Sequence, residues 1–317
     1  MIVQDQKSYI GIDVSKNILD VYILPTSKYM QFKNDVKGIK KLMTKVKLLS
    51  PAAVVMEATG GYERKVASSL TQDKIPVSIV NPRQIRAFAK ALGKLAKTDQ
   101  IDAKTIALFA QNIKPNSYGS PSEEQQNLSQ NTARRRQLID MITMEKNRLH
   151  QVASHDLKKS IKRILKALEK ELDHINEKIE KEIQHNSQLI RKKDLLESIK
   201  GVGSVISATI IADLPELGSV SAKQISALVG VAPYNCDSGT LQGKRAIWGG
   251  RMPVRNALYM ATLVAMRFNA RIKAFYQKLC NAGKLKKVAM VACMRKLLII
   301  MNTMIKNNEP WRSVVLS

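Results

Sequence analysis

The stretch YIGIDVSKNILDVYILP, residues 9–25, decides how the first part of this chain folds. Two apolar, β-branched runs flank a short polar segment, a pattern that predicts a β-hairpin with its turn at Lys16 and Asn17. Both runs read as strands buried in a covered sheet. Asp13, near the end of the first run, is therefore unusual, because a carboxylate is costly to bury unless it pairs with a cation.

The elements expected after this hairpin follow the order of an RNase H-like α/β domain. They are a third strand near residues 29–32, a helix over 36–49, a strand from Ala52, a helix starting near Tyr62 and a strand over 76–80. Order alone fits other folds too. The segment KPNSYGSPS, residues 114–122, holds two prolines and several small polar residues, so we expect the first domain to end there.

Three more carboxylates occur in settings that resemble that of Asp13. Glu57 closes an apolar run in AAVVMEATGGYE, residues 52–63, and Asp99 and Asp102 lie in LAKTDQIDAKTIA, residues 95–107. Neighbouring strands can bring the first two acids together, and the i, i+3 spacing of the last two puts them on one face of a starting helix. Four such acids without His or Cys suit Mg²⁺. Taken singly, each acid also fits a turn or a helix cap.

The charge of the chain favours a polyanionic partner. Lys and Arg number 52 against 26 acidic residues, a formal net charge of +26, which is best explained by nucleic acid. An anionic membrane is the weaker alternative, because the sequence has no uninterrupted apolar run of about 18 residues and no signal-peptide pattern. We therefore expect a cytoplasmic, nucleoid-associated protein without a membrane partner.

The middle of the chain, residues 123–190, predicts a helical coiled-coil connector between an N-terminal domain (1–113) and a C-terminal domain (191–317). Apolar residues from Leu157 to Ile179 recur at steps of four or three residues, which is the pattern of a heptad seam. Heptads do not say which chain fills the seam. It could join two copies of the protein, or it could pack within the chain against Leu138 to Val152.

The C-terminal domain is expected to be helical, with two features suited to nucleic acid. Gly201 and Gly203 separate two apolar helical segments as in a helix-hairpin-helix, whose turn exposes backbone N–H groups to phosphate. An ordinary helix connection fits the same glycines. Helices follow from Met252 to Ile305, and Trp311 beyond them is expected to anchor packing, with base stacking as the alternative.

Ser238 stands in a Gly-rich loop that is crowded with cations. A serine hydroxyl becomes a useful nucleophile only where a base or metal activates it and where positive groups stabilise the charge on phosphate. The loop supplies the cations, from Lys244, Arg245, Arg251 and Arg255. Two alternatives remain from the residues alone: the serine is an ordinary turn residue, or Tyr234 at the start of the same loop is the nucleophile.

The motifs GIDVSK, MEATGGYE and KTDQIDAK, together with APYNCDSGTLQGKRAIWGGR (232–251), resemble those of the DEDD transposases, the insertion-sequence family that includes Piv-type DNA invertases. The resemblance covers nearly the whole chain. It implies an RuvC-like domain of RNase H fold, a Mg²⁺-binding tetrad and a serine that forms a phosphoserine link with DNA. On this chain the tetrad becomes Asp13, Glu57, Asp99 and Asp102, and the nucleophile becomes Ser238.

The resemblance further implies donor and target DNA, a noncoding bridge RNA as guide, and a homo-oligomer, either a dimer or a tetramer. The expected activity is DNA cleavage and rejoining by transesterification. One rival is a hydrolytic junction resolvase, in which the acids activate water. Another is a non-enzymatic nucleoid protein, in which the acids are structural caps.

Overall fold

The computed structural model describes residues 7–94, 96–115, 122–235, 237–238, 241–243 and 245–311, with only the backbone at Leu241 and Gln242. The chain forms two compact units, Met1–Ser120 and Pro121–Ser317. This division falls within the Pro-rich segment 114–122.

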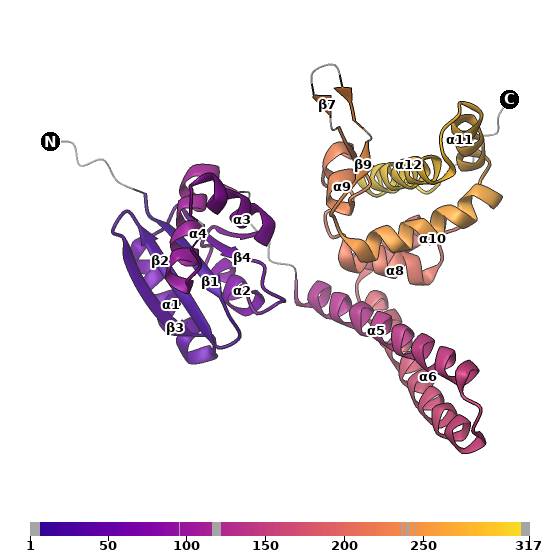
Figure 1. Ribbon diagram of the computed structural model, residues 1–317, viewed down its shortest axis with the longest axis horizontal. Helices are drawn as coiled ribbons and strands as arrows, with labels where there is room; N and C mark the ends of the chain where they lie inside the picture. Colours follow the sequence, from indigo (N-terminus) through magenta and orange to yellow (C-terminus); the bar gives the residue numbers. More distant parts are fainter. Residues whose placement is uncertain are drawn as a thin grey trace. The chain divides into compact units, whose positions relative to one another are not determined.

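The first unit is a five-stranded mixed sheet with helices on both faces (Figure 1). Its elements are β1 (Tyr9–Val14), β2 (Ile18–Leu24), β3 (Lys28–Lys33), α1 (Val36–Leu49), β4 (Ala53–Glu57), α2 (Arg64–Gln72), β5 (Val77–Val80), α3 (Pro82–Ala91) and α4 (Asp99–Ile113). The strand order is β3-β2-β1-β4-β5, antiparallel from β3 to β1 and parallel from β1 to β5. This topology is compatible with an RNase H-like domain.

Alternate residues of β1 face two different layers, as the period of a strand requires. Ile10 and Ile12 belong to the apolar core that includes Leu42 of α1 and Leu70 of α2. On the opposite face, α4 packs over the sheet through Ala103 and Ala107 and other residues of its buried side. Asp13 lies on this second face, two residues beyond Gly11. The face covered by α3 and α4 is therefore the one that can collect the acidic side chains.

The second unit is helical, with two short β-ribbons. Its elements are α5 (Glu123–Gln151), α6 (His155–Gln184), α7 (Ser187–Glu197), α8 (Ser204–Asp213), α9 (Ala222–Val229), β6 (Pro233–Tyr234), β7 (Asp237–Ser238), β8 (Leu241–Gln242), β9 (Ala246–Ile247), α10 (Met252–Phe268), α11 (Ala270–Asn281) and α12 (Lys286–Asn307). The fold class is thus mixed α/β followed by a helical unit.

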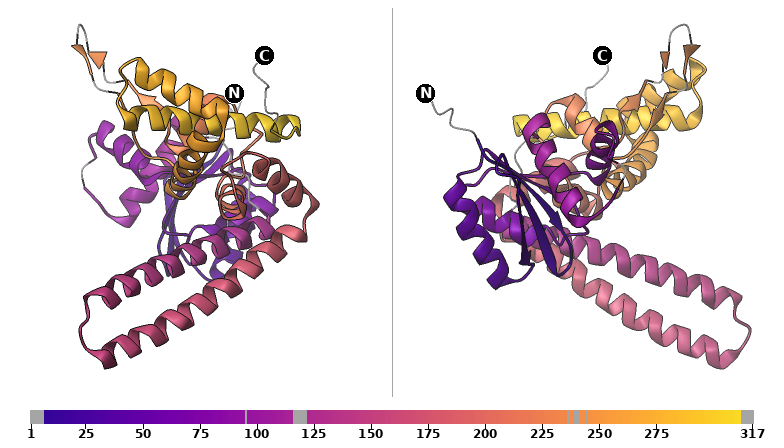
Figure 2. Two further views of the ribbon diagram at one scale, coloured as in Figure 1. Left: turned by 90° about the vertical axis from the view of Figure 1, so that its right-hand side faces the viewer. Right: turned by 60° about the vertical axis from the view of Figure 1, so that its left-hand side comes forward.

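Helices α5 and α6 form a long antiparallel hairpin within the chain (Figure 2). Asn131 bonds to Glu182 at 2.6 Å near its base, and Lys146 pairs with Glu169 at 3.2 Å further along. Ile175 and Ile179 of the predicted seam are buried in the core, whereas Leu157 and Ile164 are 57% and 48% exposed. The helix that fills the inner part of the seam is therefore α5 of the same chain.

Helix α12 forms the centre of the second unit. By length and composition it is apolar enough to cross a membrane, with a mean hydropathy of 1.7 in its most apolar window. Cys293, Leu297 and Met301 on this helix are fully buried against neighbouring helices. In its most apolar window 44% of the helix is buried, so packing inside the unit accounts for part of its apolar sequence.

Candidate active site

The four predicted carboxylates line a single cleft in the first unit, of about 480 Å³, although they come from three separate segments. Asp13 is the fifth residue of β1, and Glu57 ends β4, the parallel neighbour of β1. Asp99 and Asp102 lie in the first turn of α4. The hydroxyl of Thr98 caps this helix by accepting from the N–H of Ile101 at 3.2 Å, so the cap is Thr98 and the side chain of Asp99 is left for the cleft.

The acids interact strongly because the cleft partly removes them from water. Burial raises the pKa of Asp13 to about 6, with Asp102, Glu57, Asp99 and Asp20 adding repulsion in that order. Burial also raises the pKa of Glu57, and the charge of Asp102 adds to the effect. Such mutual repulsion favours a proton or a cation between the carboxylates.

Cations line the same cleft and oppose this effect. Lys97 and Arg86 lower the pKa of both Glu57 and Asp102, although burial keeps each pKa above its usual value. The cationic lining residues are Arg83, Arg86, Lys90, Lys94 and Lys97. The sequence reasoning missed this cationic wall. Its signal was present, because residues 83, 86 and 90 recur at helical spacing directly before the motif KTDQIDAK.

Asp20 is an acid near the cleft that the sequence reasoning also missed. It lies opposite Asp13 in the register of β1 and β2, so both side chains point to the same face. Asp20 is buried and accepts hydrogen bonds from the Tyr29 hydroxyl at 2.5 Å and from Gln31 Nε2 at 2.7 Å. The carboxylate of Asp20 is thus held by the side chains of Tyr29 and Gln31, and Asp20 does not line the cleft itself.

The chemistry of the cleft suits a hard divalent cation. Carboxylate oxygens are the ligands that such ions prefer, and a cation would offset the repulsion that raises the pKa of Asp13. Among the described residues, no group of three or more His, Cys, Asp or Glu side chains is close enough to hold a metal as it stands. Holding an ion through three or more of these carboxylates would therefore require them to lie closer together than they do here.

Ser238 lies in the second unit, on a β-ribbon that leaves the helical core. Strands β6 and β9 form the base of the ribbon, and β7 pairs with β8 further out, where Ser238 faces Leu241 in the register. Ser238 is exposed, as is Tyr234 at the base, with 53% of its surface accessible. Either hydroxyl is open to a substrate, so exposure does not separate the two candidates.

The cations predicted around Ser238 differ in their surroundings. Arg251 forms a two-pronged ion pair with Glu216, at 2.5 Å for each prong, and also donates to the carbonyl of Asp213 at 2.9 Å. Burial alone would raise the pKa of Glu216, but the hydrogen bonds from Arg251 and its positive charge bring that pKa below its usual value. Arg255 donates to the carbonyl of Gly249. Both arginines are therefore bonded to groups of the protein, Arg251 to the end of α8 and the segment that follows it, and Arg255 to the segment between β9 and α10.

Arg245 is exposed beside β9 and lines a cavity at the base of the ribbon, where it is available to an anion. Lys244 lies outside the described residues.

The two predicted phosphate-binding glycines occupy the turn between α7 and α8. Gly201 has a φ of +107°, and a Cβ there would lie 2.9 Å from the carbonyl oxygen of Ala261 on α10. Gly203 is the N-cap of α8, and a Cβ there would meet no atom within 4 Å. Packing against α10 thus explains why glycine is needed at Gly201, whereas Gly203 faces open space where a ligand could approach.

A sheet with four acids in one cleft, and a helical unit with basic side chains and an exposed serine, suit an enzyme that acts on nucleic acid. Comparison with known proteins agrees. Residues 10–155 match the family model of DEDD transposases of the IS110 type, and residues 193–277 match the model of the transposase IS116/IS110/IS902 family. The chain belongs to this transposase family and is a DNA recombinase or transposase.

Two curated relatives align over nearly their whole length. They are the pilin gene-inverting proteins of Moraxella bovis and Moraxella lacunata, each 29% identical over 320 residues, which cover 96% of this chain and 98% of the relative. DEDD transposases generally use a divalent metal. The transposase and gene-inverting matches imply that DNA is the substrate. A divalent metal is the cofactor class expected of the family.

Proposed function

We propose that this protein cuts and rejoins DNA by transesterification, with Ser238 as nucleophile and a Mg²⁺ site formed by Asp13, Glu57, Asp99 and Asp102. The observation that carries the proposal is that these four acids, from three segments, line one cleft, where burial and the charges of neighbouring acids raise the pKa of Asp13, Glu57 and Asp102. Acids that served only as turn residues or helix caps would have no reason to converge. The bound metal would supply positive charge next to the scissile phosphate.

The proposed step exchanges one phosphate ester for another. Ser238 Oγ attacks phosphorus, an Oγ–P bond forms, and one P–O bond to deoxyribose breaks. The serine proton leaves to a base, and the released deoxyribose oxygen takes up a proton. Because the phosphoserine link retains the energy of the ester, the reverse attack by another DNA end rejoins the strands without an external energy source.

The proposed partners are donor and target DNA and a noncoding guide RNA, bound by a homo-oligomer. The relatives are named for inverting a pilin gene, and such inversion requires two DNA sites to be cut and exchanged. The guide RNA and a dimer or tetramer rest on the family resemblance. The charge of +26 supports a polyanion but does not separate RNA from DNA, since both present phosphate.

The experiment is to trap a covalent protein–DNA adduct. Purified protein is incubated with its element's junction DNA and co-purifying RNA in Mg²⁺, then denatured and analysed by gel shift and peptide mapping. We expect an adduct on the peptide that contains Ser238, lost in Ser238→Ala and retained in Tyr234→Phe. Both hydroxyls are exposed, so neither change should disturb folding.

Three other outcomes would contradict parts of the proposal. An adduct that survives in Ser238→Ala and disappears in Tyr234→Phe makes the tyrosine the nucleophile. Metal-dependent cleavage without an adduct in any variant identifies water as nucleophile and the enzyme as a resolvase. Binding without cleavage, unchanged by Asp99→Ala or Asp102→Ala, leaves only an architectural role.

A further inference from the structure

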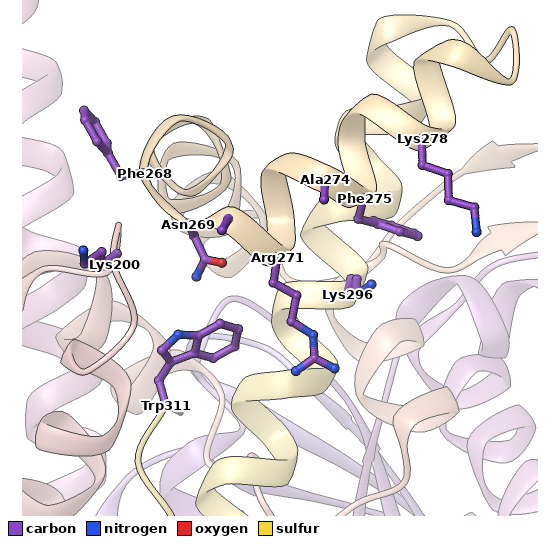
Figure 3. Close-up of a pocket in the computed structure, with 10 residues that line it drawn as sticks. Lys200, Phe268, Asn269, Arg271, Ala274, Phe275, Lys278, Lys296 and Trp311 are labelled. Atoms are coloured by element: carbon purple, nitrogen blue, oxygen red, sulfur yellow. The ribbon is translucent and has the colours of Figure 1, made fainter. Parts of the chain in front are cut away.

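A cavity of about 660 Å³ opens between the turn that joins α7 to α8, helices α11 and α12, and the segment after α12 (Figure 3). The Arg271 guanidinium lies over the indole ring of Trp311, 5.9 Å from its centre, and both side chains line the cavity. The remaining lining residues are Lys200, Phe268, Asn269, Ala270, Ala274, Phe275, Lys278 and Lys296. The volume lies within the range of small-ligand sites.

The lining combines positive charge with aromatic surface. Four cations and three aromatic side chains line the cavity, and no acid is present among its described lining residues. Lys296 lies 3.9 Å from the ring centre of Phe275, and burial, together with the nearby Arg271 and Lys278, lowers the pKa of its ammonium group. Cations held together without an acid are stabilised by an anionic ligand.

Asn269 adds a polar group without a partner. This residue is 4% exposed, and its Oδ1 caps α11 by accepting from the N–H of Ile272 at 3.3 Å. Its Nδ2 is buried and has no hydrogen-bond partner in the described part of the chain. Figure 3 shows this amide on the side of the cavity where Trp311 lies. A buried donor without an acceptor is rare in proteins, and it indicates a ligand that brings one.

Trp311 is held in place by the residues around it. Its backbone N–H donates to Ser198 Oγ at 2.9 Å, next to the turn that carries Lys200. The preceding chain is fastened by Arg191, whose Nε bonds to Asn308 Oδ1 at 2.8 Å. An aromatic face that is already positioned loses little entropy when a planar group stacks on it.

We propose that this cavity binds one unpaired nucleotide of a single-stranded nucleic acid. The base stacks on Trp311 and presents an acceptor to Asn269 Nδ2, and the flanking phosphates contact Lys200, Arg271 and Lys278. A paired base keeps its faces covered by its neighbours and cannot enter, whereas an unpaired base exposes both a face and a hydrogen-bonding edge. RNA and DNA share this chemistry, and the test below separates them.

The position of the cavity relates it to the serine ribbon in the same unit. A second cavity, of about 720 Å³, shares Arg271, Phe275 and Lys296 with the first and is also lined by Pro233 and Arg245 at the base of the ribbon. A strand held at Trp311 can therefore continue along basic and apolar surface toward β6 and β9. In the proposed recombination, this path holds an unpaired strand close to the ribbon that carries Ser238.

The test is the ratio of single-strand to duplex affinity, measured by fluorescence anisotropy with labelled oligouridine, oligothymidine and a duplex of equal length. Trp311→Leu keeps apolar packing but removes the stacking face, so we expect single-strand affinity to fall about tenfold with duplex affinity unchanged. Trp311→Phe should restore most of the loss. Asn269→Asp keeps an N-capping oxygen but removes the donor, and it should also lower the ratio.

Lys273→Ala is the matched control, because Lys273 is an exposed cation of α11 outside the cavity. It should weaken both ligands equally through lost phosphate attraction. Unchanged ratios of single-strand to duplex affinity in Trp311→Leu and Asn269→Asp would overturn the proposal. An affinity for free uridine monophosphate equal to that for oligouridine would also overturn it. Tighter binding of oligouridine would identify the strand as RNA, and tighter binding of oligothymidine would identify it as DNA.

The inference rests on the proposed function only in requiring nucleic acid, and the measurement involves no cleavage. Ser238→Ala protein should give the wild-type ratio, so a failure of the serine mechanism leaves this test intact. A failure here would equally leave the adduct experiment unaffected.

Discussion

Gly11 and Ala107 touch backbone to backbone, so closely that a Cβ on Gly11 would lie 2.3 Å from the nitrogen of Ala107 and equally close to the carbonyl oxygen of Ala103. No other residue allows α4 to lie so near β1. Asp13 is two residues further along the strand, and Asp102 precedes Ala103 on the helix. The absent side chain of Gly11 thus sets the distance between two of the four acids.

Gly11→Ala should disrupt the cleft by forcing α4 away from the sheet. Because rigid backbone surrounds the site, we expect the free energy of unfolding to fall by about 2 kcal/mol, as overpacking of cores does. Metal-dependent cleavage should fall more than DNA affinity does. Gly203→Ala is the control, since its Cβ would enter open space. Equal loss of stability in both variants, measured by urea unfolding, would contradict this explanation.

Asp13→Asn should stabilise the metal-free protein at neutral pH. The carboxyl has a pKa of about 6 in the folded protein, above its ordinary 3.8. The stability that this raised pKa contributes is fully present below about pH 4 and is lost as pH rises through about 6. At pH 7.5 the ionised group therefore costs free energy, on the order of 1 kcal/mol after discounting for solvent.

Adding metal should remove the stability advantage of Asp13→Asn over the wild type. Unfolding in EDTA should show Asp13→Asn more stable than wild type at pH 7.5 and equal to it near pH 4. Added Mg²⁺ should stabilise the wild type and leave the variant unchanged, because a carboxamide is a poor replacement for a carboxylate ligand. A wild-type melting temperature that does not respond to Mg²⁺ would speak against a metal site in the cleft.

Several features of the fold were predictable because local sequence determines them. Apolar β-branched runs interrupted by Lys16 and Asn17 define the first hairpin, and the structure has strands there with the acids on one face. The helix at 82–91 was missed although Asn81 and Pro82 form a common helix start, with Asn81 accepting from the N–H of Arg83 at 2.9 Å. Missing that helix also concealed the cationic wall of the cleft.

Other features depend on contacts that sequence patterns do not contain. The contact of Arg251 with phosphate stays a prediction, and the sequence pattern did not indicate that its guanidinium pairs with Glu216, 35 residues earlier in the chain. The need for glycine at Gly201 comes from the backbone of α10. Heptad spacing likewise identified the seam of α6 without its partner, since the apolar pattern is the same whether the second helix belongs to the same chain or to another.

The hairpin of α5 and α6 yields a stability prediction. Leu168 and Leu172 pack against the core of the second unit, so changing both to Asp should lower the free energy of unfolding by about 3 kcal/mol or more. Leu157→Asp with Ile164→Asp is the control at exposed positions and should change it by less than about 0.5 kcal/mol. Chemical unfolding measures both variants.

Light scattering on the same variants tests whether the hairpin also joins copies of the chain. Smaller particles for the Leu157 and Ile164 variant, at unchanged stability, would show that the exposed part of the hairpin makes contacts between chains. Should the Leu168 and Leu172 variant assemble less but unfold normally, the inner seam would lie between chains instead of within one.

Arg86→Ala should shift the pH dependence of cleavage toward alkaline pH. The guanidinium lowers the pKa of Glu57 and of Asp102, so its removal should raise both, and the carboxylates would then ionise at higher pH. Because ionised carboxylates bind the metal, the acidic limb of the single-turnover rate profile should move upward in pH at fixed Mg²⁺. Lys40→Ala on α1, which covers the opposite face of the sheet, is the charge-matched control and should leave the limb in place. If the acidic limb stays at the same pH while DNA affinity falls, Arg86 contacts the substrate without influencing the pKa of the acids.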